Sequence, residues 1–532
     1  MKQFLWLPMA AFLFYSCSGP RFPEHPRLVV FLAVDQLPGE LMHRIESEFT
    51  GGFKWLLDHG VDFRNAHHEH AYTVTGTGYF SLGSGRYPGP AGVLGNSWYI
   101  RTLDKTINCV EDSIAKPVGG KGRAASYRQT HATAIGDWIK DNNSKSSVIS
   151  IAGKDRAAVF MGGKNADQAI YYNWKGAFIT SDYYSESLPD WIVAFNENAG
   201  FETYRDSIWD HFAAPEFYAK YGTEDNFQGE VDEFDNEIYS PTLPVSFKKL
   251  SLDEINDKIG ATPWFDKTVL EFAEKLVIQE NLGQDDHVDL LNVGISMSDW
   301  IGHNHGPHSH EVLDYFLRLD HYLMKFINKI DNHVGLENVI FVLSSDHGAI
   351  PLPEYLQSIG IESGRLDYDI FKNRIKRIKK QLGEEIVYNG GGFYFPNHFT
   401  NQQKENALQF IKNELIDLNA FGHIFSREEI LDMDEKTSFN RRLKNMIHPQ
   451  LSPDVILVLR EYFTNRFPLG STHGTPYDYD THVPLIFSHI NTRPVRINRS
   501  VATVDIAPTI ARLAGAEIPK EVDGNVLPEV LK

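Results

Sequence analysis

Short, uninterrupted runs of apolar residues recur along the chain. A strand that is covered on both faces is apolar at every position, so such runs predict strands in the interior of a mostly parallel sheet. The predicted strands are Leu28–Val34, Val148–Ala152, Leu290–Met297, Val339–Leu343, Val455–Leu459 and Val483–Phe487.

Helical patterns lie between these runs. Apolar residues recur at helical spacing over Glu311–Ile330, and Phe371–Leu382 alternates basic and apolar positions. Thr503–Gly515 predicts a final helix that a glycine closes. Strands alternating with helices predict an α/β fold, with a doubly wound, mostly parallel central sheet and helices on both faces. Residues 191–286 and 352–449 break the pattern and are interpreted as insertions or cap elements.

Composition narrows the function classes. The chain has 532 residues, 42% of them hydrophobic, as in a folded globular protein. It has 51 Lys and Arg against 70 Asp and Glu, a net charge of −19 that argues against a nucleic-acid partner. Two cysteines exclude a disulfide scaffold and a cysteine-rich zinc site. Any metal site must therefore use carboxylates and some of the 22 histidines.

The first nineteen residues have the order of a secretory signal. Lys2 precedes an apolar run, Phe4–Tyr15, which ends in small residues around Cys17 and Gly19. A lipoprotein signal would place a lipid on Cys17 and attach the protein to a membrane, whereas cleavage after Gly19 would release it; a buried N-terminal helix is the third interpretation. We expect an exported protein of the periplasm or outer membrane, or a secreted one.

Polar residues gather where the predicted strands end. Ligands of open α/β sheets bind beyond the carboxyl ends of the strands. The candidates there are Asp35, Lys154, Arg156, Asp299, His303, Asp346, His347 and His473. Asp299 and His303 are four residues apart, so one helical turn would place both on one face. Asp and His without Cys suit hydrolytic zinc and tolerate manganese or magnesium, and two such clusters suggest a two-metal site.

A hydroxyl and two cations complete the candidate chemistry. Thr75 can open a helix whose N-terminus favours an alkoxide and an attached anion, although that segment alone is typical of an ordinary N-capping threonine. Lys154 and Arg156 are two apart in an expected extended strand end, so both would point to one side and could bind phosphate. The alternative for them is a surface ion pair with Asp155.

Two further histidine groups are interpreted without metals. His67, His68 and His70 precede the Thr75 segment and are expected to be surface or packing residues rather than ligands of a third metal. His305, His308 and His310 follow in a loop rich in Gly, Pro and Ser. We expect them to support the ligands or to face solvent.

Seven segments, in order, resemble the alkaline phosphatase superfamily of metal-dependent phosphohydrolases and sulfohydrolases. Within it the likeness is to phosphate-irrepressible bacterial alkaline phosphatases with a threonine nucleophile (the PafA type). The segments are Ala33–Gln36, Thr73–Thr75, Gly95–Tyr99, Lys154–Arg156, Asp299–His303, Ser345–Gly348 and Thr472–Gly474. The resemblance covers residues 28–532, the expected catalytic domain.

The resemblance implies a role for each residue. Thr75 matches the nucleophile, which becomes phosphothreonine. Asp35, Asp346, His347 and Thr75 match the ligands of one zinc ion, and Asp299, His303 and His473 match those of a second. Asn96, Lys154 and Arg156 match the groups that bind the phosphate oxygens. Mn²⁺ or Mg²⁺ would be a second choice of metal.

These roles predict an exported, monomeric phosphate monoesterase acting on small phosphorylated substrates. The alternatives are a phosphodiesterase or nucleotide pyrophosphatase of the same superfamily, and a non-catalytic metal-binding lipoprotein. An intact Thr75 with a full ligand set argues against the last.

Overall fold

The computed structural model describes residues 22–198, 200–232 and 241–531. The expected signal segment, with Cys17, lies outside the described residues. Among those residues, no helix combines the length and apolar character needed to cross a bilayer.

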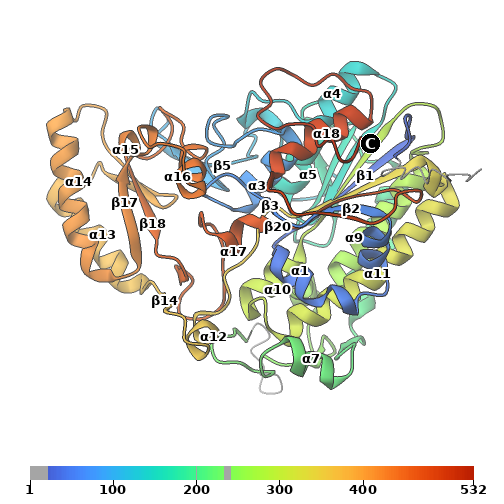
Figure 1. The fold of residues 1–532 in the computed structure, drawn as a ribbon, viewed down its shortest axis with the longest axis horizontal. Coiled ribbons are helices and arrows are strands. Elements are labelled where there is room, and N and C mark those ends of the chain that lie inside the picture. The colour runs from blue at the N-terminus through green and yellow to red at the C-terminus, as the bar shows by residue number, and fades with distance from the viewer. Residues whose placement is uncertain (1–21, 199, 233–240, 532) are drawn as a thin grey trace, which may run out of the picture.

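A ten-stranded sheet forms the centre of the molecule (Figure 1). In spatial order its strands are β22 (Val495–Ile497), β2 (Gly60–Phe63), β21 (Leu485–Ser488), β13 (Val339–Ser344), β1 (Leu28–Val34), β12 (Asp289–Ile295), β7 (Val148–Ala152), β8 (Gln168–Tyr172), β9 (Phe178–Ser181) and β6 (Pro117–Val118). The five strands from β13 to β8 are mutually parallel. The sheet turns antiparallel at β21 and β9, so the predicted mostly parallel sheet is confirmed with its flanks mixed.

Both faces of the sheet are covered by helices, as predicted. Along β1, Val30 and Leu32 enter one core, whereas Val29 and Phe31 enter the other. The first core is completed by α2 (Gly52–Asp58), α9 (Trp264–Gln279) and α11 (His310–Val334). The second is completed by α3 (Thr75–Ser84), α4 (Ile135–Asn142), α5 (Asp155–Gly162) and α18 (Ile506–Leu513). Two-sided burial explains why every position of β1 is apolar.

A smaller antiparallel sheet lies to one side (Figure 1, left). It consists of β15 (Val387–Asn389), β16 (Gly392–Tyr394), β18 (Val455–Leu459) and β17 (Phe421–Ser426). Helices α13 (Tyr368–Leu382) and α14 (Asn401–Leu415) share a separate apolar core with it.

Two strand assignments from the sequence are wrong. Val455–Leu459 belongs to the small sheet, where several of its residues are half-buried, rather than to the central one. The run at Val483–Phe487 is divided: Val483 ends β20 of a separate three-stranded sheet, and the residues from Leu485 onward enter the central sheet as β21, antiparallel to β13. A short apolar run identifies a strand without identifying its sheet or its direction, because burial alone sets its composition.

The remaining elements are mostly short. The helices are α1 (Gly39–Ile45), α6 (Asp190–Asn198), α7 (Pro215–Tyr221), α8 (Leu252–Lys258), α10 (Met297–His305), α12 (Pro353–Ser358), α15 (Arg427–Leu431), α16 (Ser438–Lys444) and α17 (Asp478–Thr481). The short strands are β3 (Ala66–His67), β4 (Ser97–Ile100), β5 (Lys105–Asn108), β10 (Ile208–Trp209), β11 (Val245–Ser246), β14 (Gly364–Arg365), β19 (Phe463–Thr464), β20 (His482–Val483) and β23 (Val501–Ala502).

Candidate active site

The carboxyl ends of β1, β12, β13 and β7 bring the candidate residues together. Asp35 directly follows β1, and Asp346 and His347 follow β13. Helix α10, which carries Asp299 and His303, begins two residues after β12. These strands are parallel neighbours, so their carboxyl ends meet at one edge of the sheet.

One group of side chains centres on Asp299. Oδ1 of Asp299 lies 3.2 Å from Nε2 of His303 and 3.3 Å from Nε2 of His473. One helical turn joins the first pair, as the spacing predicted. The long loop after β19 supplies His473, so this residue comes to the group from far along the chain.

A second group lies beside it at the ends of β1 and β13. Nε2 of His347 lies 3.3 Å from Oδ2 of Asp346 and 3.5 Å from Oδ1 of Asp35. All three side chains are fully buried. These three facing atoms have no hydrogen-bond partner in the described part of the chain. Two carboxylate oxygens and a ring nitrogen left unpaired in a core are costly unless a cation joins them.

The three imidazoles are oriented alike. Nδ1 of His303 contacts the carbonyl of Ser471 at 2.8 Å, and Nδ1 of His473 contacts that of Thr73 at 2.7 Å. Nδ1 of His347 lies 3.0 Å from its neighbour's carbonyl. A ring that donates from Nδ1 leaves the lone pair of Nε2 free, which is how metal-binding histidines are held.

The spacing of the facing atoms fits zinc. Zn–N and Zn–O bonds of about 2.0–2.1 Å place the corners of a tetrahedron about 3.3 Å apart. The four contacts from Nε2 atoms to carboxylates span 3.2 to 3.5 Å. Burial lowers the pKa of His303 to about 4, so that ring is neutral and able to bind a metal.

Lys154 links the two groups. Its Nζ donates to Oδ2 of Asp35 at 2.7 Å and to Oδ2 of Asp299 at 2.6 Å. Burial alone would raise the pKa of Asp299, but His303 and Lys154 hold it well below its usual range. For Asp35 burial dominates and raises the pKa to about 6.

The expected extended segment stops at Lys154, whose backbone is extended with φ of −99° and ψ of 133°, and it does not reach Arg156. Lys154 is the N-cap of α5, and Arg156 lies in the first turn of that helix, with an acidic residue between them that favours a helix start. Both side chains still reach the site, because Nη2 of Arg156 lies 3.4 Å from Oγ1 of Thr75. The pair is therefore brought together by a helix start rather than by strand alternation.

Thr75 is the first residue of α3, as the sequence predicted, and it is buried. The amide of Gly76 donates to Oδ1 of Asn96 at 2.7 Å, which fixes the carboxamide of Asn96 beside Thr75. Gly78 lets α3 approach the backbone of Asp346 closely, since a Cβ at position 78 would lie 2.1 Å from the carbonyl oxygen of Asp346.

The sequence analysis missed one residue that joins the groups. Gln36 has φ of 56°, and its backbone amide donates to Oδ1 of Asp346 at 3.1 Å. Its Nε2 donates to Oδ1 of Asp299 at 2.7 Å. Gly302 makes room for this side chain, because a Cβ at that position would lie 1.9 Å from Oε1 of Gln36. Both residues fall inside motifs quoted above, yet their pairing depends on the fold.

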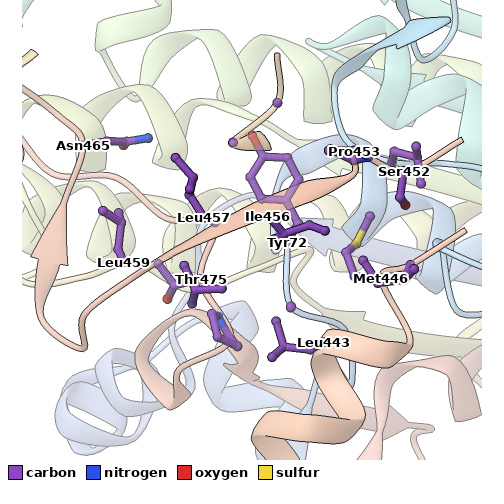
Figure 2. Close-up of a pocket in the computed structure, with 18 of the residues that line it drawn as sticks. Tyr72, Leu443, Met446, Ser452, Pro453, Ile456, Leu457, Leu459, Asn465 and Thr475 are labelled. Atoms are coloured by element: carbon purple, nitrogen blue, oxygen red, sulfur yellow. The ribbon is translucent and has the colours of Figure 1, made fainter. Parts of the chain in front are cut away.

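An apolar cavity of about 130 Å³ lies between this site and the small sheet. Figure 2 shows the ring of Tyr72 projecting among Ile456, Leu457 and Met446. A second cavity of about 240 Å³ contains Asn96, His303 and His473. The two cavities share five lining residues, namely Tyr72, Leu459, Asn465, Gly474 and Thr475. The small sheet thus supplies an apolar wall next to the polar site.

The remaining histidines have other surroundings. His67, His68 and His70 are buried, and His68 bonds the Ser345 carbonyl at 2.8 Å, so these are packing residues. For His305 the solvent-facing alternative is wrong. It is buried and lies against Glu230 and Glu311.

The chain matches a known protein family. Residues 29–472 match the model of the type I phosphodiesterase / nucleotide pyrophosphatase family. The chain belongs to that family. It is thereby a member of the alkaline phosphatase superfamily.

Individual relatives extend over nearly the whole chain. Alkaline phosphatase PafA of Elizabethkingia meningoseptica is 28% identical over 519 residues, which cover 95% of this chain and 94% of the relative. Alkaline phosphatase PhoV of Synechococcus elongatus is 27% identical, covering 96% and 94%. The crystal structure of wild-type PafA superposes with a TM-score of 0.87, covering 96% of this chain and 99% of that one.

A more distant structure shares the fold. Murine ectonucleotide pyrophosphatase / phosphodiesterase 5 is 13% identical, with a TM-score of 0.52, and covers 94% of this chain and 97% of that one.

Proposed function

We propose that this protein is a metal-dependent phosphatase that hydrolyses phosphate monoesters through a phosphothreonine at Thr75. The observation that carries the proposal is the position of Thr75 Oγ1 at a helix N-terminus, 3.4 Å from the guanidinium of Arg156. Lys154, two residues before that arginine, bonds to a carboxylate of each candidate metal-binding group. Relatives named alkaline phosphatases, similar over nearly the whole chain, support it.

Side chains of this protein supply the nucleophile and hold the phosphoryl group. Oγ1 of Thr75 attacks phosphorus and displaces the ester oxygen, and water then hydrolyses the phosphothreonine. Arg156 and the NH₂ group of Asn96 hold the non-bridging oxygens and offset their charge. The apolar cavity beside Tyr72 accommodates the organic part of the ester.

Two divalent cations, Zn²⁺ first among them, would be held by Asp35, Asp346, His347 and Thr75 and by Asp299, His303 and His473. When bound, they would lower the pKa of the threonine hydroxyl and stabilise charge on the departing oxygen.

The family's name favours a second candidate, a phosphodiesterase or nucleotide pyrophosphatase. Lys154 and Arg156 support the monoester, because two cations match a dianion better than the single charge of a diester. The discriminating experiment compares 4-nitrophenyl phosphate with bis(4-nitrophenyl) phosphate as substrates. Lys154→Ala should lose more kcat/KM on the monoester, and the exposed Lys175→Ala should lose on neither. Preferential turnover of the diester by the wild-type protein would overturn the monoesterase proposal.

Export and lipid attachment are part of the same proposal. The basic start, apolar run and Cys17 of the first nineteen residues support it. Cell fractionation of the full chain tests it. The wild-type protein should be exported and found in the membrane fraction, whereas Cys17→Ser protein should be absent from that fraction. Unchanged membrane partitioning of Cys17→Ser would contradict the lipid anchor.

A further inference from the structure

Three ionisable side chains meet in the interior, apart from the residues of the candidate active site. Glu230 lies in the loop between α7 and β11, His305 ends α10, and Glu311 lies in the first turn of α11. Nδ1 of His305 is 3.8 Å from Oε2 of Glu230 and 3.7 Å from Oε2 of Glu311. The exposed fractions of the three residues are 5%, 7% and 1%.

The polar atoms of this cluster have no hydrogen-bond partner among the residues that the structure describes. These atoms are both carboxylate oxygens of Glu230, both of Glu311 and Nδ1 of His305. No Lys or Arg of the described chain pairs with either glutamate. An unpaired polar group in the interior is destabilising, and more so if it is charged. Five unpaired buried atoms at one point need a partner, which a bound ion could supply.

We propose that Glu230, His305 and Glu311 bind a divalent metal ion at a site separate from the active site. One ion satisfies the facing atoms together, and its charge balances the two carboxylates. The ligand set selects the class of ion. Two carboxylates with an imidazole suit Zn²⁺ or Mn²⁺, whereas Ca²⁺ takes oxygen ligands.

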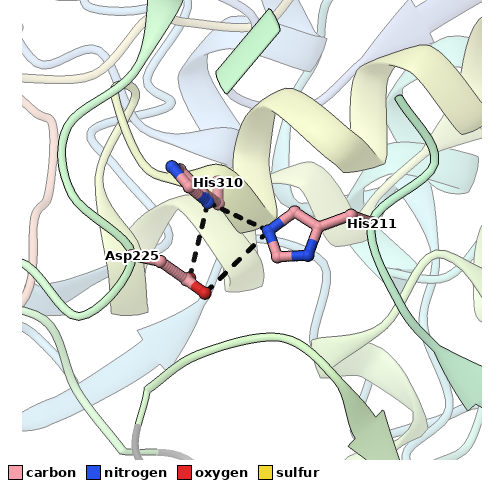
Figure 3. A group of neighbouring side chains, drawn as sticks. All are labelled: His211, Asp225 and His310. Atoms are coloured by element: carbon pink, nitrogen blue, oxygen red, sulfur yellow. Dashed lines mark hydrogen bonds and ion pairs between the residues drawn. The ribbon is translucent and has the colours of Figure 1, made fainter. Parts of the chain in front are cut away.

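A neighbouring cluster of His211, Asp225 and His310 differs from this one, because its rings have hydrogen-bond partners (Figure 3). Nε2 of His211 lies 3.0 Å from Nδ1 of His310, and Asp225 lies within 4 Å of both rings. Nε2 of His310 is bonded to the carbonyl of Thr223. The two rings therefore satisfy one another and the backbone, and the residues are only partly buried. Of this cluster, Oδ1 of Asp225 alone is buried without a hydrogen-bond partner in the described part of the chain, against five such atoms in the first cluster.

The position of the proposed ion gives it a structural role. The loop that carries Glu230 is bonded to the end of α10, where the amide of Val231 donates to the carbonyl of Asn304 at 2.9 Å. His303 precedes that residue on the same helix. An ion held by Glu230 and His305 would join the loop to α10 and so brace the helix that carries Asp299 and His303.

Metal counting tests the site. Full-length protein is stripped with a chelator, reloaded with Zn²⁺, desalted and analysed by inductively coupled plasma mass spectrometry. Glu230→Gln should retain one ion fewer per chain than wild type. Glu224→Gln, an exposed residue of the same loop, should match wild type. Equal counts in wild type and Glu230→Gln would overturn the proposal.

A second measurement does not depend on a variant that folds. Wild-type crystals grown with Zn²⁺ should show an anomalous peak at the zinc edge between Glu230, His305 and Glu311. Absence of that peak, with zinc bound at the other sites, would overturn the proposal whatever the variant does. Neither experiment uses catalysis, so the result is independent of the proposed function.

Discussion

Nη2 of Arg156 lies 3.4 Å from Oγ1 of Thr75, across the space before the N-terminus of α3. A guanidinium beside a hydroxyl at a helix N-terminus forms a site for an anion that is attacked by that hydroxyl. A phosphoryl group bound by Arg156 would therefore lie beside the hydroxyl of Thr75.

Removing the hydroxyl of Thr75 should abolish turnover. Thr75→Ala is expected to lower kcat/KM for 4-nitrophenyl phosphate by at least about 10³-fold, because the chain then lacks its nucleophile. Thr75→Ser keeps a hydroxyl and should retain much more activity than the alanine variant. Acid-quenched reactions with labelled substrate should trap phosphate on wild type and on Thr75→Ser only. Full activity of Thr75→Ala would exclude the mechanism.

Replacing the planar fork of Arg156 should weaken phosphate binding even when the charge is kept. Arg156→Lys presents a point charge that cannot contact two oxygens at once. We expect kcat/KM for the monoester to fall about 10–100-fold, and inhibition by inorganic phosphate to weaken. Arg205→Lys, at a guanidinium that contacts Glu202 and the Leu250 carbonyl instead, serves as the matched control. Unchanged inhibition by phosphate in Arg156→Lys would contradict this role.

Metal removal should inactivate the enzyme reversibly. Chelation is expected to abolish activity and Zn²⁺ to restore it, because Asp35 Oδ1, Asp346 Oδ2 and His347 Nε2 face one another with no hydrogen-bond partner in the described part of the chain. Asp346→Asn removes one negative ligand, so restoration should need at least about 10-fold more Zn²⁺. The exposed Asp141→Asn should behave as wild type. Activity that survives complete chelation, checked by metal analysis, would refute metal dependence.

Most of the fold and of the candidate site follows from local sequence patterns. β1 and β7 begin and end where their apolar runs do, and the spacing of Asp299 and His303 predicts the helix that carries them. Such features depend on period and on strand ends, which a single sequence displays.

The features that were missed depend on contacts between distant segments. Gln36 joins the two groups only because Gly302 leaves space for its side chain. The sheet to which Val455–Leu459 belongs is determined by its neighbours in the folded chain and not by its own sequence. Glu230 and Glu311 are 81 positions apart, and the sequence shows nothing that distinguishes them from exposed glutamates.

A methyl group at Gly78 should disturb both stability and the site. The new Cβ would lie 2.1 Å from the carbonyl oxygen of Asp346, so α3 or the strand end must move. Gly78→Ala is expected to lower the free energy of unfolding by about 2 kcal/mol or more. Gly200→Ala, where nothing lies within 4 Å of the added Cβ, is the control and should be near neutral. Urea unfolding measures both, and equal stabilities would contradict the close approach.

His68 should make stability depend on pH. Burial lowers its pKa from 6.5 to about 4. Between these values the unfolded chain binds more protons than the folded one, so this residue's contribution to stability rises with pH over that window. The difference corresponds to about 3 kcal/mol at most. Wild type should therefore lose up to about that much more stability than His68→Gln when urea unfolding is compared at pH 7 and pH 4. The exposed His131→Gln should follow wild type at both pH values. If His68→Gln and wild type lose equal stability between the two pH values, His68 is not held neutral in the folded protein.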